Sequence, residues 1–142
     1  MSEDKPFFIC VDFDATICDH EDIVPYRPRI GKPIPGAVEA LLSFQELGAN
    51  IILYTIRSNF LNGLNQINIA EKYLWDNGIR LYAVNNNPSQ KSWSDSRKVY
   101  ADVYIDDRNI GCPMTYSDGF ARPYVDWSIV RHTVEFMIKN RQ

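Results

Sequence analysis

Short runs of apolar residues alternate along the chain with longer segments in which apolar residues recur every three or four positions. Uninterrupted apolar runs such as 7–11 indicate strands buried on both faces, whereas the recurring pattern indicates helices with one buried side. Polar stretches that carry proline and glycine separate these segments. The pattern predicts strands at 7–12, 50–55, 79–85 and 101–107 and helices at 35–48, 64–77 and 127–140.

The ends of the predicted helices carry residues that usually start or stop a helix. Pro35 suits the first turn of the first helix. Gly48 and Gly78 stand where the first two helices are expected to end. Asp126 directly precedes the last helix and is expected to act as its N-cap. These signals support the three helix assignments.

Strands that alternate with helices form a parallel sheet with helices on both faces. The pattern therefore predicts an α/β fold, a three-layer, Rossmann-like parallel sheet of four to five strands flanked by helices. No repeat or linker divides the 142 residues, so residues 1–142 are expected to form one domain. Because crossovers between parallel strands are right-handed, the carboxyl ends of the strands are expected at one edge.

Composition narrows the class of protein without naming a function. The net charge is −3 and no block of Lys or Arg occurs, which argues against broad, non-specific nucleic-acid binding. The 3 cysteines include no CxxC pair, so neither a zinc site nor a disulfide framework is indicated. No apolar run approaches membrane-spanning length and the polar N-terminus lacks a signal-peptide core, so a soluble, cytoplasmic protein is expected.

Polar residues end three of the predicted strands, at the edge where open α/β sheets bind ligands. Asp12 ends the first strand, Thr55 ends the second, and Asp106 and Asp107 end the fourth. Carboxylates gathered at one edge repel each other unless a cation neutralises them, and ligation by oxygen alone suits Mg²⁺. Lys98 lies just before the fourth strand and adds a positive charge near the same edge.

These groups suit the chemistry of a phosphate dianion. Asp12 is placed to attack phosphorus and form an aspartyl phosphate, while a metal ion shields the two negative charges from each other. Asp14, two residues further on, is placed to give a proton to the leaving oxygen and later to take one from water. The residues thus favour magnesium-dependent phosphoryl chemistry.

Four short motifs resemble those of the haloacid dehalogenase superfamily of phosphatases and phosphotransferases. "VDFDATI" resembles the first motif, "ILYT" the second, Lys98 the third and "VYIDD" the fourth. The four occur in the family's order and span roughly residues 7 to 107. The family more often has Gly where this chain has Ala15, and Gly tolerates backbone shapes that Ala does not. The resemblance implies a hydrolase of phosphomonoesters on this fold.

The resemblance also implies a metal site. In the family's pattern Asp12 is the nucleophile and a magnesium ligand, and Asp14 is the general acid/base whose backbone carbonyl contacts the metal. Asp106 is a ligand, directly or through water, and Asp107 supports it. A competing interpretation makes Asp107 only a cap for the turn that follows.

Phosphate-binding residues follow from the same resemblance. Thr55 and Lys98 hold phosphoryl oxygens, and the backbone near Phe13 and Arg57 contacts the phosphoryl group. Lys91 competes with Lys98 for this role, and Arg57 has an alternative interpretation as an ordinary solvated arginine.

Superfamily members differ mainly in the cap that covers the site. The first connection, 17–34, is too short for a folded cap, so the chain resembles the capless subgroup, with no separate cap domain. An open site admits a phosphorylated small molecule or polymer end, or is covered by a second copy of the chain. Arg27, Arg29 and Lys32 give the first connection the charge of a flap, or they belong to a solvated loop. Trp93 either stacks on substrate or holds its own loop in place.

A magnesium-dependent phosphatase is the leading hypothesis. A phosphotransferase with the same intermediate and a catalytically silent phosphate- or metal-binding module are alternatives. A receiver-like signalling domain carries similar residues, but here the paired aspartates follow the lysine, and this order resembles the dehalogenase pattern.

Overall fold

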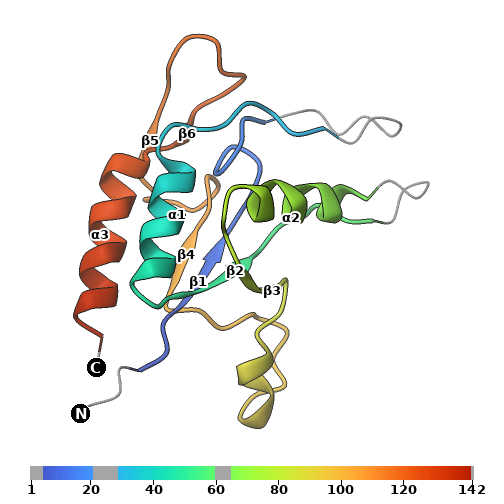
Figure 1. The fold of residues 1–142 in the computed structure, drawn as a ribbon, viewed down its shortest axis with the longest axis vertical. Coiled ribbons are helices and arrows are strands. Elements are labelled where there is room, and N and C mark those ends of the chain that lie inside the picture. The colour runs from blue at the N-terminus through green and yellow to red at the C-terminus, as the bar shows by residue number, and fades with distance from the viewer. Residues whose placement is uncertain (1–4, 21–28, 60–64, 142) are drawn as a thin grey trace.

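The computed structural model describes residues 5–20, 29–59 and 65–141. Its main sheet contains four parallel strands in the order β3-β2-β1-β4 (Figure 1). The expected α/β fold class is confirmed, and each strand is shorter than expected by two to four residues. The strands are β1 Phe8–Val11, β2 Asn50–Leu53, β3 Leu81–Val84 and β4 Val103–Ile105.

The strand register sets the level at which the functional side chains begin. Val11 of β1 pairs with Leu53 of β2 on one side and with Ile105 of β4 on the other. The residues that follow, among them Asp12 and Asp106, therefore leave the sheet side by side. The backbone N–H of Asp12 still donates to the carbonyl of Ile105 at 2.9 Å, which extends this alignment by one residue.

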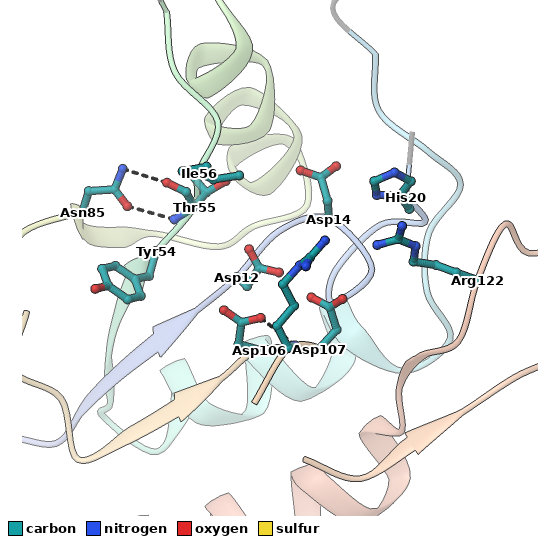
Figure 2. Close-up of a pocket in the computed structure, with 11 residues that line it drawn as sticks. Asp12, Asp14, His20, Tyr54, Thr55, Ile56, Asn85, Asp106, Asp107 and Arg122 are labelled. Atoms are coloured by element: carbon teal, nitrogen blue, oxygen red, sulfur yellow. Dashed lines mark hydrogen bonds between the residues drawn. The ribbon is translucent and has the colours of Figure 1, made fainter. Parts of the chain in front are cut away.

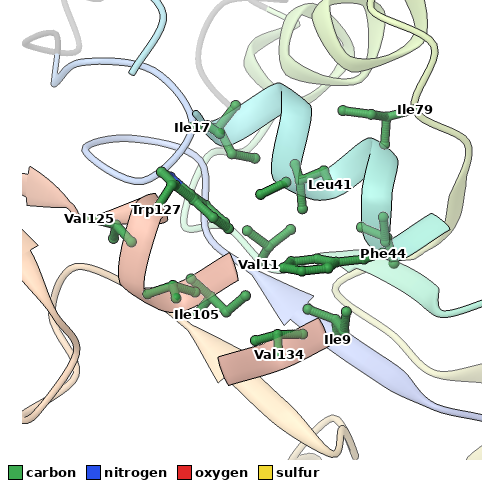
Figure 3. Close-up of a cluster of buried hydrophobic side chains, with 14 of the residues drawn as sticks. Ile9, Val11, Ile17, Leu41, Phe44, Ile79, Ile105, Val125, Trp127 and Val134 are labelled. Carbon is green, nitrogen blue, oxygen red and sulfur yellow. The ribbon is translucent and has the colours of Figure 1, made fainter. Parts of the chain in front are cut away.

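Three helices pack on one face of the sheet. They are α1 Ala37–Glu46, α2 Gln66–Asp76 and α3 Trp127–Lys139, and the buried residues of all three join a single core cluster with alternate residues of the strands. Figure 1 shows α1 and α3 side by side over the sheet, and Figure 3 shows Phe44 and Trp127 facing Val11 between them. This core fixes β1, the strand that leads to Asp12.

The opposite face of the sheet has a thinner cover. Phe8 and Cys10 of β1 point into a second, smaller cluster with Val99 and Ala101. The covering segment is the β3–β4 connection, whose only regular element is the short 3₁₀ helix η1, Pro88–Ser92. Helices were expected on both faces. This connection is polar and lacks helical periodicity, so a loop with one tight turn takes the place of an α-helix.

Trp93 contacts another residue of the same β3–β4 connection. Its ring meets the ring of Tyr100 edge-on, with centroids 5.5 Å apart, and 63% of Trp93 is exposed. Trp93 does not line the large cavity at the carboxyl edge of the sheet, and the cited contact is within its own loop.

The helix ends largely follow the sequence signals. The side chain of Asp126 accepts from the N–H of Ser128 at 3.1 Å and caps α3, and Gly48 and Gly78 adopt positive φ just past α1 and α2. Pro35 lies before the helix instead of in its first turn, because Gly36 is the N-cap of α1. Leu64, the expected first residue of the second helix, lies outside the described residues.

A small antiparallel hairpin between β4 and α3 was not expected. Its strands are β5 Met114–Thr115 and β6 Tyr124–Val125, which are too short to produce a recognisable pattern. The N–H of Ala121 donates to a carboxylate oxygen of Asp19 at 2.8 Å. This bond ties the hairpin loop to the first connection beside the carboxyl edge of the sheet. Among the described residues, none of the helices combines the length and apolar character needed to cross a membrane.

The turn after Asp12 places an alanine in a glycine-like conformation. Ala15 has φ 61° and is almost fully buried. Its N–H donates to the carbonyl of Cys18 at 2.7 Å, and the N–H of Ile17 donates to the carbonyl of Phe13 at 2.8 Å. A tight turn thus follows Asp12, with left-handed strain at Ala15.

We predict that Ala15→Gly changes the free energy of unfolding by less than about 1 kcal/mol, since relief of the left-handed strain offsets the greater freedom of the unfolded chain. Ala15→Val should lower it by more than about 2 kcal/mol, because a β-branched side chain tolerates positive φ poorly in a filled core. Ala70→Gly is the matched control. Ala70 is equally buried but helical, so there the change to Gly should cost about 1 kcal/mol or more.

Urea unfolding of the three variants measures these differences. A loss at Ala15→Gly as large as that at Ala70→Gly would contradict the assignment of strain to Ala15.

Candidate functional site

A cavity of about 620 Å³ opens at the carboxyl edge of the sheet. Its lining comes from the residues that follow β1, β2 and β4, as the register requires (Figure 2). Two further walls come from outside the sheet, with His20 on the first connection and Arg122 on the β5–β6 hairpin. The position agrees with the general rule for ligand sites in open α/β sheets.

Three carboxylates form a compact group at the floor of this cavity. Asp12, Asp106 and Asp107 each offer an oxygen atom within 4.8 Å of the others. Figure 2 shows the three side chains next to one another, while the carboxylate of Asp14 is turned away from them. The sequence placed all four residues in a metal site, with Asp14 contributing its backbone carbonyl. The structure gathers the other three carboxylates, and the contact of the Asp14 carbonyl with a metal stays a prediction.

Negative charge is costly in the three-carboxylate group, because the group is partly buried and its members repel one another. Burial, the hydrogen bond to Asp107 and the charge of Asp106 raise the pKa of Asp12 from 3.8 to about 8. Burial is also the largest cause that raises the pKa of Asp106. A divalent cation removes both the repulsion and the need for a proton, and three oxygen ligands leave room for waters and a phosphate around Mg²⁺. The donor set therefore fits a magnesium ion.

Thr16 links two members of this group. Its hydroxyl donates to a carboxylate oxygen of Asp12 at 3.1 Å and accepts from the N–H of Asp107 at 3.3 Å. Its carbonyl accepts from the indole N–H of Trp127 at 2.6 Å. The first residue of α3 thus fixes the turn that orients Asp12. Sequence reasoning assigned Thr16 no role beyond its place in the first motif.

The side chain of Asp106, rather than that of Asp107, caps the turn after β4. A carboxylate oxygen of Asp106 accepts from the N–H of Arg108 at 2.9 Å, and its carbonyl accepts from the N–H of Asn109 at 3.1 Å. The residue that caps this turn is therefore Asp106 and not Asp107. Asp107 faces the other two carboxylates.

Thr55 lies at the end of β2, held by Asn85 from the end of β3. The N–H of Thr55 donates to the Asn85 side-chain oxygen at 2.8 Å, and the Asn85 amide donates to the Thr55 carbonyl at 3.1 Å (Figure 2). Its hydroxyl accepts from the N–H of Arg57 at 3.0 Å. Asn85 also lines the cavity.

The Arg57 side chain is directed at Asp14 and not at the three-carboxylate group. Its Nε donates to Oδ2 of Asp14 at 2.8 Å and its Nη2 donates to Oδ1 at 2.7 Å. Only 3% of Arg57 is exposed, so the solvated-arginine interpretation is wrong. The side chain of Arg57 is thus engaged by a carboxylate, and the contact expected between the backbone near Arg57 and a phosphoryl group stays a prediction.

Lys98 lies in a smaller cavity of about 280 Å³ that shares Tyr54 and Asp106 with the larger one. Its Nζ lies 5.5 Å from the centre of the Tyr104 ring. The competing Lys91 is exposed on η1. Of the two lysines, Lys98 thus lines a cavity together with Asp106, but it is not part of the lining of the large cavity.

Two arginines that sequence reasoning did not assign also line the large cavity. Arg108 directly follows the paired aspartates, and Arg122 comes from the hairpin loop. Arg122 is far from every motif in the sequence, so no spacing pattern identifies it. Arg108 directly follows the fourth motif, and this position is the one feature of the sequence that points to a place at the site.

Two basic residues of the first connection, Lys32 and Arg29, make contacts within the fold. Nζ of Lys32 donates to the carbonyl of Gly119 and lies 4.3 Å from the centre of the Phe120 ring. The carbonyl of Arg29 accepts from Nη2 of Arg57 at 2.8 Å. Arg27 lies outside the described residues. Lys32 thus joins the connection to the hairpin, and the two together form one wall.

We predict that without metal the free energy of unfolding falls as pH rises from about 4 to about 8, on the order of a few kcal/mol in total. Over this range the folded chain keeps a proton on Asp12 that the unfolded chain has released, so raising the pH favours unfolding. Mg²⁺ should restore the lost stability most strongly above about pH 7, where the carboxylates are ionised.

Urea unfolding in EDTA and in Mg²⁺ across this pH range measures both effects. Asp12→Asn should flatten the metal-free profile, whereas Asp118→Asn, on the exposed hairpin loop, should leave it unchanged. A metal-free stability that rises over the same interval would contradict the electrostatic description of the group.

Comparison with known proteins yields an extensive match among solved structures. A scan of family models and a search of curated proteins return no match. Among solved structures, a conserved protein from Bacteroides thetaiotaomicron is 31% identical, with a TM-score of 0.65 over 97% of this chain and 100% of that chain. A D,D-heptose 1.7-bisphosphate phosphatase from B. bronchiseptica, complexed with magnesium and phosphate, is 20% identical, with a TM-score of 0.43 over 55% of this chain and 48% of that chain.

The partial match is too weak to support an argument about fold or function. The first match extends over nearly the whole of both chains at an identity that indicates common descent. The chain therefore belongs to the same family as the conserved Bacteroides thetaiotaomicron protein.

Proposed function

We propose that this protein is a magnesium-dependent phosphomonoester hydrolase of the haloacid dehalogenase type that acts through an aspartyl phosphate on Asp12. The observation that carries the proposal is the separation of the carboxylates into two sets. Asp12, Asp106 and Asp107 form a group that fits a cation, and Asp14 stands apart on the wall of the same cavity. The four sequence motifs that resemble this superfamily support the same assignment.

The separation suits in-line displacement at phosphorus. The attacking and leaving oxygens lie on opposite sides of the phosphorus atom, so the nucleophile and the proton donor must not be in contact. In the first half-reaction an oxygen of Asp12 bonds to phosphorus while the bond from phosphorus to the leaving oxygen breaks. The leaving oxygen takes a proton from Asp14 and departs as an alcohol.

The second half-reaction restores the protein. Water bonds to phosphorus, gives a proton to Asp14, and the bond between phosphorus and Asp12 breaks. Phosphate is released, Asp12 is again a carboxylate and Asp14 is again protonated. The water and the leaving group use the same side of the phosphorus atom, which is why one acid/base residue serves both steps.

Magnesium, held by Asp12, Asp106 and Asp107, would neutralise the carboxylates and stabilise negative charge on the phosphoryl oxygens. The side chains of this protein would do the remaining positioning. Thr16 orients Asp12 through its hydroxyl, and Asn85 fixes the backbone of Thr55. Because the guanidinium of Arg57 is engaged with Asp14, we assign Arg122 and Arg108 on the cavity lining to attract the substrate's negative charge.

We predict that wild-type protein releases phosphate from an aryl phosphate in Mg²⁺ and not in excess EDTA. Asp12→Asn should lower kcat at least about a thousandfold, because the amide cannot form the covalent intermediate. Asp118→Asn on the hairpin loop is the matched control and should retain wild-type activity. Phosphate release and transfer to added alcohols are measured together, so that phosphotransfer is detected if it competes with hydrolysis.

Trapping of the phosphorylated protein by rapid acid quench locates the intermediate, and its absence in Asp12→Asn is expected. Turnover that survives in Asp12→Asn, or that is indifferent to EDTA, would refute the mechanism.

We also predict that Arg122→Gln raises KM for a phosphomonoester by about tenfold and leaves kcat within about threefold, because it removes a charge that attracts substrate without touching the reacting atoms. Arg80→Gln is the matched control. Arg80 stacks on Trp75 with 3.8 Å between its guanidinium carbon and the ring centre, and Trp75 is no part of the cavity lining. A kcat that falls with KM unchanged would place Arg122 on the transition state instead.

A further inference from the structure

Arg57 is a buried cation, and each of its three side-chain nitrogens donates at least one hydrogen bond. Besides its two bonds to Asp14, Nη1 donates to Oε1 of Gln66 at 3.1 Å and Nη2 donates to the carbonyl of Arg29 at 2.8 Å. The guanidinium also lies over the ring of Phe13, 4.9 Å from its centre. These partners come from the turn after β1, the first connection and α2, so three separate parts of the fold converge on one side chain.

Such a cation is expensive to bury for stability alone. A buried ion pair is often no more stabilising than an apolar packing of the same volume, so its presence in a site suggests that it performs a task. The task is visible in the geometry. Two parallel bonds from one guanidinium fix both the position and the rotation of the Asp14 carboxylate. A lysine, with a single point of charge, would fix the position alone.

The pairing leaves Asp14 able to handle a proton. Each carboxylate oxygen has two lone pairs, and Arg57 uses one on each. The carboxyl side chain retains 18% exposure and lines the cavity, so a free lone pair can face the substrate. Gln66 and Arg29 in turn stop the guanidinium from rotating or following the carboxylate.

We infer that Arg57 is the positioning residue for the general acid/base Asp14, and that it acts on the leaving group rather than on the phosphoryl group. This inference rests on the proposed function and deepens it. The consequence concerns substrates. An enzyme with a firmly oriented proton donor hydrolyses esters of poorly acidic alcohols, and a misplaced donor restricts it to esters whose leaving group departs without a proton.

The test uses aryl phosphates of similar shape and graded leaving-group acidity, from para-nitrophenyl through phenyl to para-methoxyphenyl phosphate. The parameter is kcat/KM, because it reports the steps up to departure of the leaving group. Wild type, Arg57→Lys, Asp14→Asn and the double variant are compared. Arg131→Lys is the matched control; its partner is Glu135, one turn further along α3, and neither residue lines the cavity.

Arg57→Lys should lower kcat/KM about 30-fold or more for para-methoxyphenyl phosphate and less than about threefold for para-nitrophenyl phosphate, as loss of general acid catalysis requires. In the Asp14→Asn background the same change should have no further effect, because Arg57 acts through Asp14. Arg131→Lys should match wild type on every ester.

An equal loss on all esters, or full additivity with Asp14→Asn, would overturn the inference and indicate a structural or phosphate-binding role. If circular dichroism shows that Arg57→Lys does not fold, Gln66→Met serves instead. It removes one acceptor of the guanidinium and should produce the same leaving-group dependence at about three- to tenfold. A folded wild type that releases no phosphate from any ester would refute the proposed function, and this role with it.

Discussion

Repulsion among three carboxylates at one edge of a parallel sheet is the constraint on which the rest of this structure depends. The register of β1 with β4 brings Asp12 beside Asp106 and Asp107, and burial makes their charges costly. The fold tolerates this arrangement because the core beneath it is apolar and closely packed, with β1 buried on both faces. This repulsion lowers the stability of the metal-free protein, and a cation bound to the three carboxylates can restore that stability.

The surrounding polar network separates the acid groups by function. Thr16, itself held by Trp127, connects the side chain of Asp12 with the backbone of Asp107, and so ties the turn after β1 to the end of β4. Asp14 forms an ion pair with Arg57, and its carboxylate lies apart from the three that repel one another. Asp12 and Asp14 are two residues apart in the motif but enter different electrostatic environments, which is what the proposed roles of nucleophile and proton carrier require.

The walls of the cavity are built from segments that contribute little to the core. Within the described part of the chain no separate cap domain covers the edge; the first connection and the β5–β6 hairpin lie there, joined by Asp19 and Lys32. This pairing brings Arg122 from the hairpin to the cavity. Under the proposed function, a change in this one short hairpin would alter the choice of substrate without altering the strands that carry the carboxylates.

The sequence by itself determined the parallel α/β fold, the end of each helix within a few residues, and the convergence of Asp12, Thr55, Asp106 and Asp107 on one edge. These follow from local periodicity and from the fixed hand of parallel crossovers, which need no knowledge of side-chain packing. Only the tertiary structure decided that Arg57 serves Asp14, that Arg122 lines the cavity, that the second face is covered by a loop and that Ala15 adopts a left-handed turn. Each of these depends on contacts between segments far apart in the chain or on a backbone angle that a residue type alone does not specify.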